Sequence, residues 1–163
     1  MTLARLNSLD RAAFVEAIGW VFELSPWVAE QVSGARPYPS IERLHEAMVN
    51  QVETAPADRQ LALLRGHPDL GTRLRISAAS TVEQAGAGLD RLTQNEFERL
   101  QSLNSAYHEK FGFPFLFAVK GSTKYDIFEA LERRLAATPE EERREALRQV
   151  YRIAEVRLRE TIE

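Results

Sequence analysis

The chain has three histidines and no cysteine, so histidine is its main candidate for proton transfer near neutral pH. Gly66 and Pro68 flank His67 and predict an extended conformation at the end of a helix, because the residue before a proline is disfavoured in the α region. A ring held there has little freedom, which suits a general acid or base, although an ordinary loop histidine shows the same pattern. His45 and His108 fall inside predicted helices, where structural roles are expected.

A carboxylate and an amide come together near a predicted helix start. Ser80-Thr81-Val82-Glu83 has the form of a capping box, in which Glu83 bonds back to the amide of Ser80. The same helix start offers free N–H donors and a partial positive charge beside Gln84, and this combination can bind a polar ligand. Both interpretations of Glu83 stay open.

Arg157 falls on the apolar face of the predicted last helix. At about 100° per residue, one broad arc of that helix is formed by Leu147, Val150, Tyr151, Ile153, Ala154, Leu158 and Ile162. Arg157 lies inside this arc, and a buried guanidinium needs an anion or several acceptors. We expect either an internal salt bridge, for instance to Glu83 or Asp69, or a bound carboxylate or ureido oxygen.

Predicted helices position these residues, because apolar residues along the chain recur at the spacing of an α-helix. We predict an all-α bundle of about eight helices, with one extended apolar segment at residues 113–119 whose amides and carbonyls need partners, possible ligand atoms among them. The first helix is expected to be capped by Asn7 or Ser8, and a short second helix by Ser25. Further helices are predicted after Ser40, over about 58–65, over about 80–89, from Thr93 to Phe111, after Ser122 and from Thr138.

Composition limits the class of protein. A chain of 163 residues predicts a single domain over 1–163, and a net charge of -3 argues against nucleic acid as a partner. The longest apolar stretch contains Pro114 and the N-terminus resembles no signal peptide, so we expect no membrane association and a cytoplasmic location. The sequence lacks phosphate-binding, dinucleotide and HExxH motifs, which disfavours common cofactor enzymes.

Two other functions are compatible with these features. A metal-dependent hydrolase would use His67, Asp69, Glu83 and His108, although no two of these histidines have i, i+4 ligand spacing. A non-catalytic helical interaction module would need no pocket around His67.

Several motifs together resemble one family, the 2-oxo-4-hydroxy-4-carboxy-5-ureidoimidazoline (OHCU) decarboxylases. They run in order along nearly the whole chain: residues 22–28 (FELSPWV), 67–71 (HPDLG), Glu83-Gln84 with 87–89 (AGL), 103–107 (LNSAY), 110–115 (KFGFPF) and Arg157-Leu158.

The resemblance implies a cofactor-free, metal-free, all-helical homodimer that acts on OHCU as its small-molecule substrate and forms (S)-allantoin. It places the catalytic groups on His67, Glu83 and Arg157. Further substrate contacts fall on Pro68, on Ser80, Thr81, Val82, Glu83 and Gln84, and on the backbone of Phe115, Leu116, Phe117, Ala118 and Val119.

Overall fold

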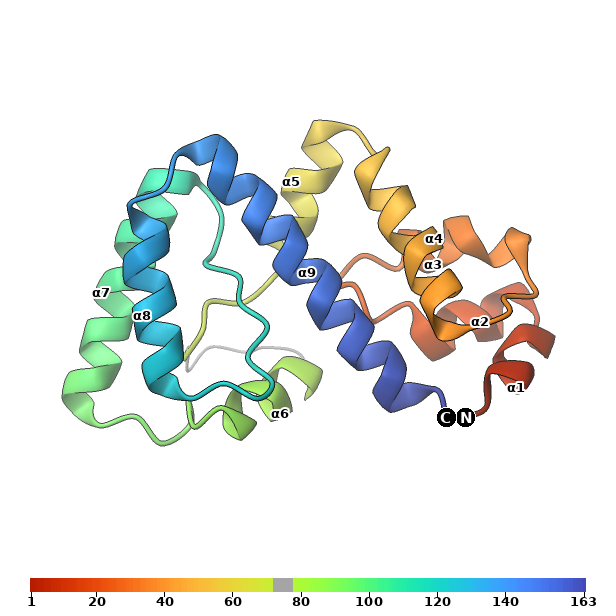
Figure 1. Ribbon diagram of the computed structural model, residues 1–163, viewed down its shortest axis with the longest axis horizontal. Coiled ribbons are helices and arrows are strands. Elements are labelled where there is room, and N and C mark those ends of the chain that lie inside the picture. The colour runs from red at the N-terminus through yellow and green to blue at the C-terminus, as the bar shows by residue number, and fades with distance from the viewer. Residues whose placement is uncertain (72–77) are drawn as a thin grey trace. The chain divides into compact units, whose positions relative to one another are not determined.

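All regular elements of the described chain are helices. The computed structural model describes the backbone of residues 1–71 and 78–163, and the side chains of these residues except 78–80. This part of the chain forms nine α-helices and one 3₁₀-helix, which confirms the predicted all-α class (Figure 1). It divides into two compact units, residues 1–66 with 150–163, and residues 67–149.

The first unit buries one apolar face from each of its main helices. Its elements are α1 (Leu3–Ser8), α2 (Arg11–Ile18), α3 (Trp27–Val32), η1 (Ser33–Ala35), α4 (Ile41–Glu53), α5 (Ala57–Arg65) and the last part of α9 (Pro139–Thr161). Ser40 caps α4 by accepting from Arg43 N at 3.2 Å, as predicted, and Leu44 and Met48 are buried on its inner face.

Two predicted caps in this unit are wrong. Asn7 and Ser8 belong to α1, a helix that the apolar pattern did not indicate, and Asp10 caps α2 instead by accepting from Ala13 N. Ser25 does not cap α3, because its hydroxyl donates to the Glu23 carbonyl at 2.9 Å. Short polar side chains have several backbone partners within reach, so the residue type alone does not select one.

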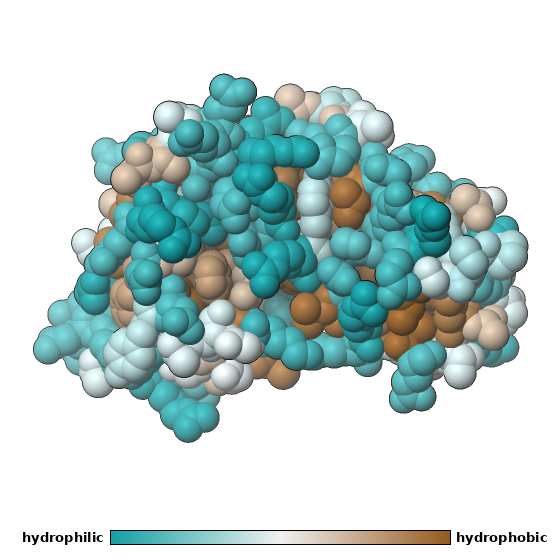
Figure 2. Space-filling view, in the orientation of Figure 1, coloured by the Kyte–Doolittle hydropathy of each residue, from teal (hydrophilic) through white to brown (hydrophobic). Residues whose placement is uncertain are grey.

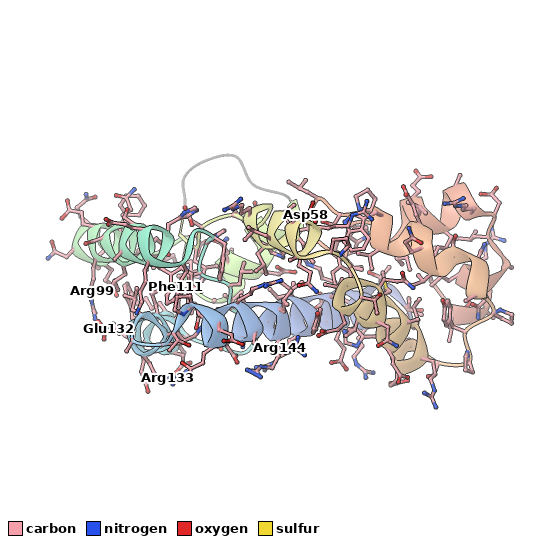
Figure 3. The ribbon with its side chains drawn as sticks, turned by 90° about the horizontal axis from the view of Figure 1, so that it is seen from above. Asp58, Arg99, Phe111, Glu132, Arg133 and Arg144 are labelled. Carbon is pink, nitrogen blue, oxygen red and sulfur yellow. The ribbon has the colours of Figure 1, made fainter. Side chains whose placement is uncertain are left out.

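The second unit contains α6 (Ala78–Gly86), α7 (Gln94–Phe111), α8 (Lys124–Leu135) and the first part of α9. The predicted Thr93–Glu96 capping box starts α7, and Gly112 ends it in the left-handed conformation. Helices α7 and α8 pack side by side, and Arg99 and Glu132 form an ion pair between them (Figure 3). The connection between the two helices carries the predicted non-helical apolar segment, residues 113–119 (Figure 1).

Helix α6 begins earlier than predicted. Ala78 is already helical, so Ser80 and Glu83 lie within the helix and do not form a capping box at its start. Alanine has the highest helix propensity, and Ala78 and Ala79 extend the helix toward the N-terminus. The side chain of Ser80 lies outside the described residues.

The face drawn in Figure 2 is mostly hydrophilic, with apolar side chains showing through in smaller areas. Among the described residues, no helix combines the length and the hydropathy needed to cross a lipid bilayer.

Candidate active site

His67 lies directly after the C-terminus of α5. Gly66 ends the helix and its N–H donates to the Ala62 carbonyl at 3.0 Å, so the chain leaves the helix one residue before the histidine. His67 is only 7% exposed. The other two histidines differ: His45 Nε2 lies 2.8 Å from the Tyr151 carbonyl, which fits a structural role, and His108 is exposed on α7. A buried imidazole just beyond a helix end is well placed to meet a ligand.

Two side chains hold the segment that follows the histidine, residues 67–71, here called the His67 loop. Asn104 Nδ2, from α7, donates to the Leu70 carbonyl at 2.9 Å. Gly71 N donates to Gln84 Oε1, from α6, at 2.9 Å. Gln84 was predicted to contact substrate, and its side-chain oxygen supports the loop. The backbone beside His67 is therefore fixed from two helices.

The close approach of the loop to α7 depends on Gly71. Its φ is +69°, and a Cβ placed there would lie 2.4 Å from Leu100 Cδ2, a side chain that is almost fully buried. We expect Gly71→Ala to lower the free energy of unfolding by about 2–4 kcal/mol, from backbone strain together with overpacking. Gly121→Ala is the matched control, because its φ is +80° but nothing lies within 4 Å. Urea denaturation measures both variants, and equal losses would contradict a packing role for Gly71.

Asp69, in the His67 loop, has a partly buried carboxyl group. Among the described residues, its buried Oδ1 atom has no hydrogen-bond partner, and neither does the buried Asn104 Oδ1. Both residues line a cavity of about 900 Å³ between the loop and α7, together with His108. Burial raises the pKa of Asp69 above its ordinary 3.8, and the charge of His108 partly opposes this. The native state therefore disfavours the ionised form of this carboxyl group.

This burial predicts a pH-dependent stability effect. As pH rises from 3.8 through the higher native pKa, the unfolded chain releases the Asp69 proton first, so the native state is destabilised and stays so at pH 7. We expect Asp69→Asn to be more stable than the parent at pH 7, and the difference to shrink at about pH 4. Urea titrations at both pH values measure it. The exposed Asp90→Asn is the control, and a gain that is the same at both pH values would contradict the assignment.

Arg157 is buried, as its position on the helix predicts, and its partner is Glu23. Arg157 Nη1 lies 2.9 Å from Glu23 Oε2, and both side chains are at most 5% exposed. The same nitrogen lies 3.3 Å from the carbonyls of Trp20 and Val21. Of the two alternatives left open for Arg157, the structure shows an internal salt bridge, to Glu23; the examples named from the sequence were Glu83 and Asp69. The available signal was an acidic residue, Glu23, flanked by the apolar Phe22 and Leu24.

Side chains of α8 and α9 hold the backbone of the apolar segment 113–119. Arg134 Nη1 donates to the Leu116 carbonyl at 2.5 Å, and Ala118 N donates to Gln149 Oε1 at 2.9 Å. The rings of Phe115 and Phe117 stack with centroids 6.0 Å apart. Sequence reasoning identified the segment but neither anchor.

Most of the predicted site residues lie in the unit formed by residues 67–149, and Arg157 lies in the other. Within the unit of residues 67–149, His67 is buried, Pro68 and Glu83 are half-buried, and Thr81 and Val82 are exposed on α6. No three His, Cys, Asp or Glu side chains of the described residues gather closely enough to hold a metal ion.

Comparison with known proteins gives consistent results. A family model described as OHCU decarboxylase matches residues 7–159. An OHCU decarboxylase from Haloferax volcanii is 47% identical, over 98% of this chain and 95% of the relative. The corresponding mouse protein is 37% identical, over 97% of this chain and 91% of the relative.

Among solved structures, a crystal structure of (S)-allantoin synthase matches 99% of this chain with a TM-score of 0.83 and 35% identity. This chain spans 54% of that protein. The match of the family model over nearly the whole chain, with the identity to the Haloferax volcanii protein, shows that the chain belongs to the OHCU decarboxylase family.

Proposed function

We propose that this protein is a carboxy-lyase of urate degradation that decarboxylates 2-oxo-4-hydroxy-4-carboxy-5-ureidoimidazoline to (S)-allantoin. The observation that carries the proposal is the 47% identity to a decarboxylase of this name, almost end to end in both chains. The buried His67, held in a supported loop, is the structural feature that best fits this chemistry.

The reaction needs no electron sink beyond the substrate. The bond between the ring carbon and the carboxylate breaks, carbon dioxide leaves, and the electron pair moves into the conjugated imine and carbonyl groups of the substrate. A proton then adds to the adjacent ring carbon, which carries the ureido group, while the hydroxyl group on the carbon that lost the carboxylate gives up its proton and becomes a carbonyl. The face of the ureido-bearing carbon that receives the proton sets the S configuration. The protein has to orient the ring, stabilise the developing charge and control that proton, so we propose that it acts without a metal ion or cofactor.

We assign roles to the predicted site residues on this basis. His67 is the general acid/base, and Glu83 acts with it on the substrate hydroxyl group. Arg157 binds a carboxylate or ureido oxygen through the planar fork of its guanidinium. Further contacts are assigned to Pro68, to residues 80–84 and to the backbone of residues 115–119.

The proposal also covers domain organisation, oligomeric state and location in the cell. Residues 1–163 act as one domain, which the family match over 7–159 supports. The protein works as a homodimer in the cytoplasm. Analytical ultracentrifugation tests the dimer, and a single species of 18.5 kDa would contradict it.

Circular dichroism of the product tests the function directly. Freshly generated OHCU decays without enzyme to racemic allantoin, which has no signal. We expect the purified protein to produce a fast-growing signal of the S enantiomer, and the rate to be unchanged by a chelator. Folded protein that gives no signal above the uncatalysed reaction would overturn the proposal.

A further inference from the structure

We propose that Gln149 and Arg134 are positioning residues that set the substrate-facing backbone of residues 113–119. This inference rests on the proposed function. The two side chains come from different helices, α9 and α8, and each bonds to one backbone group of the segment, Ala118 N and the Leu116 carbonyl. All the groups lie within the unit of residues 67–149.

Arg134 belongs to a buried polar cluster. Its Nε donates to Glu142 Oε1 at 2.6 Å, and the Tyr107 hydroxyl donates to the same oxygen at 2.5 Å. Glu142 is 1% exposed, Tyr107 is fully buried and Arg134 is 6% exposed. The guanidinium also lies over the Phe115 ring, 4.5 Å from its centroid. The bond to Leu116 is therefore directed by a cluster that leaves Arg134 little freedom.

Such a cluster is a costly way to stabilise a core. Desolvating two charges offsets much of their attraction, and apolar side chains of similar volume often stabilise a protein as well or better. What the cluster provides that apolar packing cannot is a donor with a fixed direction, aimed at the Leu116 carbonyl. The geometry thus favours a positioning role over a purely stabilising one.

The two anchors also determine which backbone groups remain for substrate. The stacked rings of Phe115 and Phe117 lie on the same side of the chain, as alternate residues do in an extended segment. The N–H and carbonyl groups of successive residues point to alternate edges of such a segment. Leu116 and Ala118 therefore direct these groups toward the side chains of Arg134 and Gln149. Phe117 and its alternate neighbours then direct theirs to the opposite edge. Within the 115–119 backbone, this narrows the proposed substrate contacts to Phe115, Phe117 and the N–H of Val119. The Val119 carbonyl already accepts from Ser122 N at 3.0 Å, and Leu116 and Ala118 face the anchors.

Gln149→Met tests the inference, because it keeps the side-chain volume and removes the acceptor for Ala118 N. We expect KM for OHCU to rise about tenfold and the S excess of the product to fall, with kcat changing less. A merely structural role would lower the melting temperature and leave KM and the S excess unchanged.

Two further variants make the test specific. Gln149 Nε2 donates to Glu145 Oε1 at 2.9 Å. In the exchange E145Q/Q149E the amide at position 145 donates to the carboxylate at position 149, whose second oxygen can accept from Ala118 N. We expect it to recover KM to within about twofold of the parent, as should E145Q alone. Arg134→Lys has a single nitrogen that cannot reach both Glu142 and Leu116, and should raise KM as Gln149→Met does.

The parent protein is assayed beside each variant. An inactive parent would count against the proposed function. An active parent with KM unchanged in both Gln149→Met and Arg134→Lys would overturn the positioning role alone. If Gln149→Met does not fold, Arg134→Lys and the exchange variant decide the question by the same readouts.

Discussion

Replacing His67 with asparagine should leave the protein folded and lower its rate of (S)-allantoin formation by roughly 10²–10⁴-fold, the usual contribution of a general acid or base. Asparagine is polar and smaller than the imidazole, so it fits without overpacking at a site that is 7% exposed. Asparagine cannot exchange a proton near neutral pH. The rate of the remaining catalysed reaction should therefore lose the pH dependence that the imidazole of His67 contributes. The circular dichroism assay of the product measures the rate, and far-ultraviolet circular dichroism checks the fold.

His108→Asn is the matched control for this variant. The residue is an exposed histidine of the same compact unit, on α7, and the proposed mechanism gives it no role. Its activity should stay within about twofold of the parent. Full activity in the His67→Asn protein would remove His67 from the mechanism.

Replacing Arg157 with methionine should destabilise the fold strongly. The change leaves the Glu23 carboxylate buried without the guanidinium 2.9 Å away, and breaking a buried pair in this way costs about 3–5 kcal/mol. Urea denaturation at pH 7 measures the loss. The double variant E23Q/R157M has no buried charge at this position and should recover most of that free energy.

The same pair of variants separates stability from substrate binding. If Arg157 holds the substrate as proposed, E23Q/R157M should be folded but should lose kcat/KM by about tenfold to a hundredfold, the size expected for a charge-assisted contact. Glu23→Gln alone keeps the guanidinium and should retain most of the activity. A fully active double variant would show that Arg157 serves only to pair with Glu23.

Local sequence signals identified those helix ends where one side chain reaches only one partner. Thr93 and Glu96 bond reciprocally at the start of α7, and Ser40 caps α4, because both motifs close within three residues. The same reasoning failed for Ser25, which bonds to the Glu23 carbonyl, and for the start of α6, where two alanines extend the helix. The first outcome depends on competing local bonds of similar energy, and the second on helix propensity.

The anchors of the site were not predictable in the same way. Gln84 supports Gly71, thirteen residues away in the chain, and Asn104 supports Leu70 from α7. Arg134 and Gln149 reach the 113–119 segment from separate helices. Nothing in the local pattern marks these side chains, because a buried amide or guanidinium in a helix looks like any other polar residue until its neighbours are known.

The sequence by itself determined the all-α class, the family, the apolar face of the last helix and the placement of His67 beyond a helix end. These follow from periodicity, from flanking glycine and proline, and from motifs that span the chain. Only the tertiary structure decided that Glu23 pairs with Arg157 and which side chains hold the His67 loop and residues 113–119. Buried polar groups need partners, but which partner is near depends on packing between elements distant in the chain.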